Sequence, residues 1–200
     1  MINIPHLLLA AGTSKRMGEP KQLLNWGDKK LIQFQIERIL LTTEKLFIIL
    51  GAHADIIEPY IKKYNIDIIR YDHWEYGMGN SIAYGVQQIL KSKIKLDGIL
   101  ISLIDQPLIT SSHYLKMRSL FQKGKDQIIV SKSDTGWCGV PVLFDVFFFD
   151  SLKSLTGEEG AKEILKKNQE NAVFINGGNI LVDMDTPEVY QELAKKYFQI

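Results

Sequence analysis

Residues 6–21 of the chain read HLLLAAGTSKRMGEPK, and this stretch decides the fold. An apolar run passes first into small residues and then into charged ones. Continuously apolar runs that end at small residues are typical of strands covered on both faces. We therefore expect a buried strand over His6–Ala11 and an exposed loop after it.

Short apolar runs of the same kind alternate with amphipathic stretches along most of the chain. The pattern predicts helices after an N-cap at Asp28, over Ala54–Tyr64, over Ser81–Leu90 and from Pro187 onward. Such alternation predicts a three-layer αβα, Rossmann-like fold with a mainly parallel sheet, and without a linker or repeat we interpret residues 1–200 as one domain. The further strands expected are Lys45–Leu50, Ile66–Arg70, Gly98–Ile104, Gln127–Ser131, Val140–Phe144, Val173–Ile175 and Ile180–Val182.

The composition is that of an ordinary globular protein. Apolar residues make up 46% and charged residues 24%, and the formal net charge of +1 argues against a nucleic-acid partner. Cys138 is the only cysteine, so neither an intrachain disulfide nor a cysteine metal cluster is expected. We find no secretory signal and no apolar run of the ~18 residues that a membrane span needs, so we expect a cytoplasmic protein without a membrane partner.

The loop after the first expected strand carries the clearest chemical signal. Small residues at Ala10, Ala11 and Gly12 allow a phosphate to approach the backbone, whose N–H groups can donate to it. Arg16 can hold phosphate oxygens with two parallel hydrogen bonds, while Lys21 adds a compact positive charge. The loop is therefore predicted to bind a phosphate group.

Two familiar phosphate-binding motifs do not fit this chain. A P-loop requires G-x-x-x-x-G-K-[S/T], but Gly18 is followed by Glu and Pro. The dinucleotide motif G-x-G-x-x-G begins at Gly77 and Gly79 but has Ile82 at the position of the third glycine. An ordinary turn with solvated basic residues is the alternative to a phosphate site of another class.

Acidic residues follow two of the later strands, at the edge of the sheet where ligands of parallel sheets bind. Asp105 emerges from a buried run, where a carboxylate is costly unless a cation neutralises it. Mg²⁺ shared with phosphate oxygens would do so, and a helix cap after Thr110 or a turn with Pro107 is the alternative. Asp183 and Asp185 alternate along an extended segment, so only one of them is expected to face a nucleotide.

A second loop with glycines follows the third expected strand. Gly79 favours close approach of a ligand, and Asn80 and Ser81 offer hydrogen-bond donors and acceptors. Ser81 is equally compatible with a helix cap.

Together with these loops, residues 9–21 resemble the signature L-A-A-G-x-x-x-R-M-x-x-P-K of nucleotidyltransferases. Within that superfamily the chain is most similar, from His6 to Tyr190, to the MobA-like NTP transferases and their molybdenum cofactor cytidylyltransferases. The resemblance implies the nucleotide-diphospho-sugar transferase fold with a mixed sheet. The nucleotide-binding residues that it implies are Leu9, Ala10, Ala11, Gly12, Arg16, Lys21, Gly79, Asn80, Ser81 and Asp105.

The same resemblance implies roles in catalysis and metal binding. It makes Arg16, Lys21 and Asp105 catalytic residues, and it makes Mg²⁺ the cofactor, held by Asp105 and Asp185. Whether Asp183 contributes to the metal site stays open.

Two further segments resemble those that line the acceptor side in this family. Residues 139–144 resemble G-H-P-V-L-F, with Val140 in place of the histidine, and residues 155–162 resemble L-x-G-D-x-G-A-R. We therefore expect the acceptor to lie at Gly139, Pro141 and Gly160. The second segment replaces Asp by Glu and Arg by Lys, so the acceptor can differ from that of the family.

The reaction that the resemblance implies is transfer of CMP from CTP to the phosphate of a molybdopterin acceptor, with release of pyrophosphate and delivery of the product to a molybdoenzyme. Because a phosphate is already anionic near neutral pH, no general base is required. The alternatives are GTP as donor, a sugar phosphate as acceptor, or a non-catalytic cofactor carrier or maturation chaperone. A carrier would be expected to have lost at least one of four charged residues, and all are present: Arg16, Lys21, Asp105 and Asp185.

Overall fold

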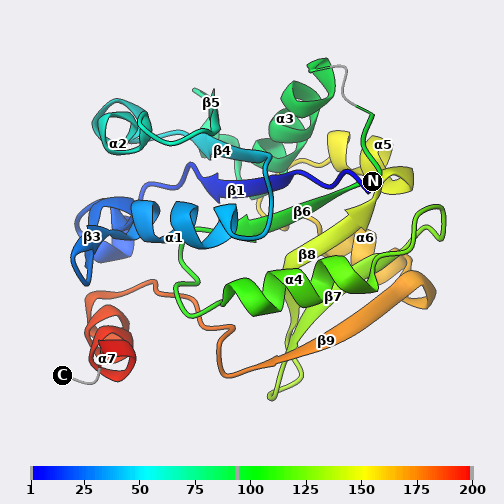
Figure 1. The fold of residues 1–200 in the computed structure, drawn as a ribbon. Helices are drawn as coiled ribbons and strands as arrows, with labels where there is room; N and C mark the ends of the chain where they lie inside the picture. The colour runs from blue at the N-terminus through cyan, green and yellow to red at the C-terminus, as the bar shows by residue number, and fades with distance from the viewer. Residues whose placement is uncertain (1, 93–94, 199–200) are drawn as a thin grey trace.

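A seven-stranded sheet forms the centre of the molecule (Figure 1). The computed structural model describes residues 2–92 and 95–198. The strand order is β5-β4-β1-β6-β8-β7-β9; β8 is antiparallel to β6 and β7, and the other neighbouring pairs are parallel. The expected mixed, mainly parallel sheet is thus confirmed. Its strands are β1 (His6–Ala10), β4 (Leu46–Leu50), β5 (Asp67–Arg70), β6 (Gly98–Leu103), β7 (Ile128–Ser133), β8 (Cys138–Asp145) and β9 (Ala172–Gly178).

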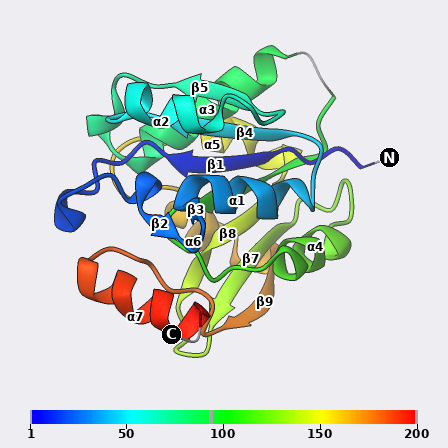
Figure 2. The same cartoon turned by 60° about the vertical axis from the view of Figure 1, so that its left-hand side comes forward.

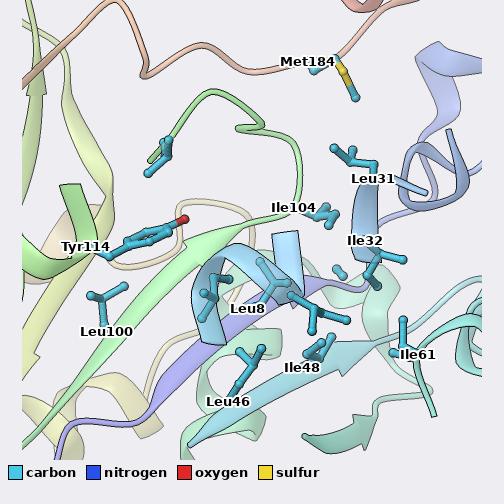
Figure 3. Close-up of a cluster of buried hydrophobic side chains, with 14 of the residues drawn as sticks. Leu8, Leu31, Ile32, Leu46, Ile48, Ile61, Leu100, Ile104, Tyr114 and Met184 are labelled. Carbon is cyan, nitrogen blue, oxygen red and sulfur yellow. The ribbon is translucent and has the colours of Figure 1, made fainter. Parts of the chain in front are cut away.

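Strand β1 is covered on both faces, as its apolar run predicts. Leu8 and Ala10 face one hydrophobic core, while Leu7 and Leu9 face the other. Figure 3 shows the first core, where Leu8 lies among side chains from neighbouring strands and helices. Burial of apolar side chains on two faces makes the centre of the sheet a rigid support for the loops at its edge.

The helices form the outer layers. The first core packs against α1 (Leu31–Leu40), α2 (Ala54–Ile61), α4 (Ser111–Leu120) and α7 (Pro187–Phe198). The second core packs against α3 (Met78–Lys91), α5 (Phe149–Lys153) and α6 (Lys162–Lys167). Figure 1 shows α1 and α4 in front of the sheet. Short 3-10 turns complete the structure: η1 (Lys15–Met17), η2 (Lys21–Leu23), η3 (Trp74–Tyr76), η4 (Val146–Phe148) and η5 (Gln169–Asn171).

The expected N-cap at Asp28 is wrong. Asp28 lies in the turn of a two-stranded hairpin, β2 (Asn25–Trp26) with β3 (Lys29–Lys30), and α1 begins only at Leu31. The hairpin turn is favoured because Gly27 adopts the left-handed conformation, with φ 67°. Trp26 anchors this hairpin against α7, and Figure 2 shows the two elements next to each other.

Other segments also differ in extent from the expectations, most of all β8 and β9, which are longer than the expected Val140–Phe144 and Val173–Ile175. The segment Ile180–Val182 is not a strand, and shortly after it the N–H of Met184 donates to the carbonyl of Asp105, beyond the end of β6, at 2.7 Å. Helix α2 ends at Ile61, and α3 begins at Met78 rather than at Ser81. The helix expected from Pro187 is confirmed as α7. None of the helices within residues 2–92 and 95–198 has both the length and the apolar character that a membrane crossing requires.

Candidate active site

A cleft of about 490 Å³ opens beyond the carboxyl ends of β1 and β6. This is the edge at which parallel sheets bind ligands, because the loops that leave neighbouring strands meet there. Five parts of the chain line it: the loop after β1, the segment from η3 into the start of α3, the end of β6, the loop at Glu158 and the chain before α7. The lining residues are Leu9, Ala11, Gly12, Thr13, Ser14, Lys15, Arg16, Lys21, Gln22, Trp74, Glu75, Gly77, Met78, Ser81, Leu103, Ile104, Asp105, Glu158 and Asp185.

The loop after β1 presents free backbone donors to this cleft. Within the described residues, the N–H groups of Gly12, Thr13 and Ser14 donate to no protein group. A side chain added at Gly12 would meet no atom within 4 Å, and Gly12 does not adopt a positive φ. Glycine at this position is therefore required neither by packing nor by backbone strain, and the open space beside it suits a ligand that approaches the backbone closely.

An ionic cluster joins three distant parts of the sequence at one wall of the cleft. The Nζ of Lys21 lies 3.0 Å from Oδ2 of Asp105 and 2.7 Å from Oδ1 of Asp185. Nη2 of Arg16 lies 2.7 Å from Oδ2 of Asp185. The two predicted metal ligands thus converge on a single ammonium group, next to the free N–H groups of the loop.

Partial burial makes each charge of this cluster dependent on its partners. Burial by itself would lower the pKa of Lys21, but the charges and hydrogen bonds of Asp105 and Asp185 outweigh it and raise the pKa above its usual value. Burial would likewise raise the pKa of Asp185, but Lys21 and Arg16 outweigh it and lower that pKa. Lys21 and Asp185 are therefore both charged at neutral pH.

The carboxylates also fit a divalent cation. Oδ1 of Asp105 is buried and has no hydrogen-bond partner among the described residues, which is costly for a charged oxygen. A hard cation such as Mg²⁺ prefers carboxylate oxygens and satisfies such an atom. No group of three or more His, Cys, Asp or Glu side chains suited to a metal ion occurs within the described residues. A cation here would need phosphate oxygens or water to complete its coordination.

A family model described as the MobA-like NTP transferase domain matches residues 6–172. The chain belongs to this family. Purine catabolism protein PucB of Bacillus subtilis (strain 168) is 31% identical, over 96% of this chain and 97% of that protein. Molybdenum cofactor cytidylyltransferase of Escherichia coli (strain K12) is 22% identical, over 100% of both chains. The structure of Rv0371C from Mycobacterium tuberculosis H37Rv in complex with manganese has a TM-score of 0.77 and 20% identity, over 97% of this chain and 98% of that one.

In this MobA-like nucleotidyltransferase the carboxylates of Asp183 and Asp185 have different surroundings. The carboxylate of Asp183 accepts a hydrogen bond of 2.9 Å from Nε2 of the buried Gln106. Burial, followed by the nearby charge of Asp105, raises the pKa of Asp183. The expectation that only one acid of this pair faces the cleft agrees with the lining, which includes Asp185 alone of the two.

Two predicted nucleotide-binding residues of this MobA-like chain hold another loop instead of lining the cleft. The N–H of Gly79 donates to the carbonyl of Gly157 at 2.7 Å, and Oδ1 of Asn80 accepts from the N–H of Gly157 at 2.8 Å. A Cβ at Gly79 would lie 2.6 Å from the carbonyl oxygen of Thr156, so the glycine is needed for this close approach. Neither residue lines the cleft, and contact of Gly79 and Asn80 with the nucleotide stays a prediction.

The other predicted nucleotide-binding residues divide between the cleft and its support. Ser81 lines the cleft, and its hydroxyl donates to the carbonyl of Gly77 at 3.3 Å from inside α3, so it does not cap that helix. Leu9 and Ala11 also line the cleft, whereas Ala10 lies beneath it with its carbonyl hydrogen-bonded to Gln22.

The predicted acceptor residues gather near a second, smaller cavity of about 60 Å³. Gly139 lines this cavity together with Trp137, and Met78 lines both the cavity and the cleft. Pro141 and Gly160 do not line it. The carbonyl of Pro141 accepts a hydrogen bond from Ser131, and Gly160 packs against the side chain of Met78.

Several cleft residues were missed by the sequence reasoning. Glu158 lies inside residues 155–162, which resemble a family segment and so carried a signal for it, and Trp74 and Met78 lie shortly before the predicted residues Gly79, Asn80 and Ser81. Gln22 carried no signal beyond its place after Lys21, because its role depends on which backbone groups surround it in the folded chain.

Proposed function

We propose that this nucleotidyltransferase uses Mg²⁺ and CTP to transfer CMP to the phosphate of a pterin acceptor of the molybdenum cofactor, releasing pyrophosphate. The observation that carries the proposal is the convergence of Asp105 and Asp185 on Lys21, beside the free N–H groups of the loop after β1. Such an arrangement combines donors for anionic oxygens with carboxylates for a cation, which is what nucleotidyl transfer needs.

The roles of the protein's own groups follow from their positions. The N–H groups of Gly12, Thr13 and Ser14 would bind phosphate oxygens of the triphosphate, and Arg16 and Lys21 would neutralise charge on them. Asp105 and Asp185 would hold Mg²⁺, which when bound supplies charge neutralisation on the triphosphate. The acceptor phosphate then attacks the α-phosphorus while pyrophosphate leaves, and no general base is required.

Triphosphate binding would rearrange the ionic cluster. In this structure Lys21 and Arg16 pair with the carboxylates, and each pair leaves fewer donors for a ligand. Phosphate oxygens would replace the carboxylates as partners of the two cations, and Mg²⁺ would replace Lys21 as the partner of the carboxylates. Each cation and each carboxylate of the cluster would thus keep a partner of opposite charge, so that none of these partly buried charges would be left unpaired.

The choice of CTP and of a pterin rests on the relative named molybdenum cofactor cytidylyltransferase, which matches the whole chain. The structure with manganese supports a divalent cation in this fold. Delivery of the product to a molybdoenzyme in the cytoplasm is part of the same proposal.

Binding and turnover test the proposal separately. Calorimetry with CTP, GTP, ATP and UTP, each with Mg²⁺, should show tightest binding of CTP, and pyrophosphate should appear only when a molybdopterin acceptor is added. Tightest binding of GTP would indicate that GTP, and not CTP, is the nucleotide donor. A chain that binds the pterin but no nucleotide would be a cofactor carrier, and the proposed reaction would then be wrong.

A further inference from the structure

Two buried glutamines lie under the two loops that build the candidate site. Gln22 follows Lys21 in η2, and Gln35 lies in the middle of α1. Their exposed fractions are 1% and 0%. A buried amide is retained at little cost only when its donors are used, so the partners of these two side chains are informative.

Gln22 holds the loop after β1. Its Nε2 donates to the carbonyl of Ala10 at 2.8 Å and to the carbonyl of Gly12 at 3.2 Å. The carbonyl between them, that of Ala11, accepts from the N–H of Ala52 at 3.1 Å. Three consecutive carbonyl groups are therefore bound from the protein side of the loop.

Gln35 holds the loop after β6 in the same manner. Its Nε2 donates to the carbonyl of Gln106 at 3.0 Å and, at a longer 3.4 Å, to that of Ile104. The carbonyl between them, that of Asp105, accepts from the N–H of Met184 at 2.7 Å. In both loops a glutamine binds the first and third carbonyls while a backbone N–H from elsewhere binds the second.

This arrangement determines what each loop turns toward the cleft. In a trans peptide the N–H points opposite to the preceding carbonyl, so binding the carbonyls of Ala11 and Gly12 inward turns the N–H groups of Gly12 and Thr13 outward. In the second loop, the peptides on both sides of Asp105 are bound through their carbonyls, the first by Gln35 at 3.4 Å and the second by Met184 at 2.7 Å, and these contacts restrain the direction of its Cα–Cβ bond.

We propose that Gln22 and Gln35 are paired positioning residues, Gln22 for the triphosphate half of the site and Gln35 for the metal half. The inference rests on the proposed function, because it assigns the outward N–H groups to phosphate and Asp105 to the cation. Neither glutamine touches the substrate in this account. Each acts through the loop that it holds.

The test compares Gln22→Met with Gln35→Met, because methionine keeps the length and unbranched shape of glutamine but has no N–H to donate. Calorimetry measures the dissociation constant of CTP in EDTA, and then the Mg²⁺ concentration that half-saturates the CTP-bound protein. We expect Gln22→Met to weaken CTP binding at least about tenfold, even in EDTA, because preorganised donors are lost. We expect Gln35→Met to keep CTP binding in EDTA within about threefold and to raise the half-saturating Mg²⁺ concentration about 10–100-fold.

A matched control separates these effects from general destabilisation. Asp145 is buried at the end of β8, away from the cleft, and its carboxylate caps η4 through the N–H of Phe147. Asp145→Ala should lower the thermal midpoint without changing either constant. If a Met variant does not fold, Gln22→Asn and Gln35→Asn serve instead, because the shorter amide cannot reach both carbonyls.

The pattern of losses decides the inference. Equal losses of CTP and Mg²⁺ binding in the two variants, or unchanged constants in both, would overturn it while leaving the proposed function intact. A wild-type chain that binds none of the four nucleoside triphosphates would overturn the proposed function itself.

Discussion

Lys21 lies between two carboxylates that are 84 and 164 positions away along the chain. Lys21 is only 9% exposed, so its charge is stabilised by these two carboxylates rather than by water. Removal of either carboxylate would leave part of this charge uncompensated, and removal of Lys21 would leave two carboxylates facing each other. Single substitutions in this cluster should therefore affect ligand binding and stability together, and the two effects need separate measurements.

Asp105→Ala should nearly abolish turnover while the fold persists. The variant loses the carboxylate proposed to bind the cation, and loss of one such electrostatic contact typically costs ~10²–10³ in rate. Pyrophosphate release measures the rate, and circular dichroism with the thermal midpoint measures the fold. Asp150→Ala is the control, because its side chain is 94% exposed in α5. Near-normal turnover of Asp105→Ala with Mg²⁺ would contradict the assignment.

His6 should make the protein less stable in mild acid. Its side chain, on β1, is fully buried, with Nε2 2.7 Å from the hydroxyl of Ser102 on β6. Burial lowers the pKa of His6 well below the usual value, with a smaller contribution from Arg118. Below about pH 6.5 the unfolded chain therefore binds a proton that the folded chain does not. The contribution of His6 to the free energy of unfolding is complete above that pH and is lost as the pH falls.

Thermal midpoints between pH 7 and pH 5 measure this loss of stability. The midpoint of the wild type should fall more steeply than that of His6→Gln, which cannot be protonated. A smaller slope should remain in the variant, because burial also lowers the pKa of His113. Parallel pH profiles of the two proteins would show that His6 is not the titrating group.

At the scale of elements, the loops behave differently although each contains glycine. Gly12 in the loop after β1 has free space at the position of a Cβ, whereas Gly79 at the start of α3 is in contact with the backbone of Thr156. The first glycine leaves room for a ligand, and the second brings α3 against the loop at residues 156–157. Glycine thus leaves open space in one loop and permits close packing in the other.

The variants Gly12→Ala and Gly79→Ala should separate these two roles. Gly12→Ala should keep the thermal midpoint and weaken CTP binding, because its new methyl group occupies only the open space of the cleft. Gly79→Ala should lower the midpoint, because a Cβ there would lie 2.6 Å from a carbonyl oxygen and overpacking of this kind costs about 1–3 kcal/mol. Denaturant unfolding and calorimetry provide the two measurements. If Gly12→Ala lowered the midpoint and Gly79→Ala weakened only CTP binding, both interpretations of these loops would be wrong.

At the scale of the whole molecule, the cleft is assembled from segments across the sequence. The loop after β1, the segment around η3, the end of β6 and the chain before α7 all contribute side chains to it. A ligand that contacts all four segments stabilises the folded chain as a unit, because the unfolded chain has no such site.

CTP with Mg²⁺ should accordingly raise the thermal midpoint. A ligand at ~100 times its dissociation constant adds about 2.7 kcal/mol to the free energy of unfolding. For a chain of this length that is a shift of roughly 5–10 °C. The shift should shrink when EDTA replaces Mg²⁺, and differential scanning fluorimetry measures both. An equal shift in EDTA would argue against a cation shared between protein and triphosphate.

The strands and the first loop could be predicted from the sequence because their signals are local. A continuous apolar run indicates a strand covered on both faces, and the order of small and charged residues in 9–21 indicates the loop. Boundaries near Asp28 and Ile180–Val182 were wrong for a different reason. The turn at Gly27 outweighed the local pattern near Asp28, and the chain before α7 bonds through Met184 to the loop after β6 instead of pairing with a strand.

The sequence by itself determined the fold class, the family and the identity of the four charged residues of the ionic cluster. Only the tertiary structure decided that Lys21 bridges Asp105 and Asp185, that Gln22 and Gln35 hold the loops, and that Gly79 packs instead of lining the cleft. The physical reason is the distance along the chain over which each kind of interaction acts. Residue type and spacing act over a few positions, whereas these contacts depend on the order in which distant strands join one sheet.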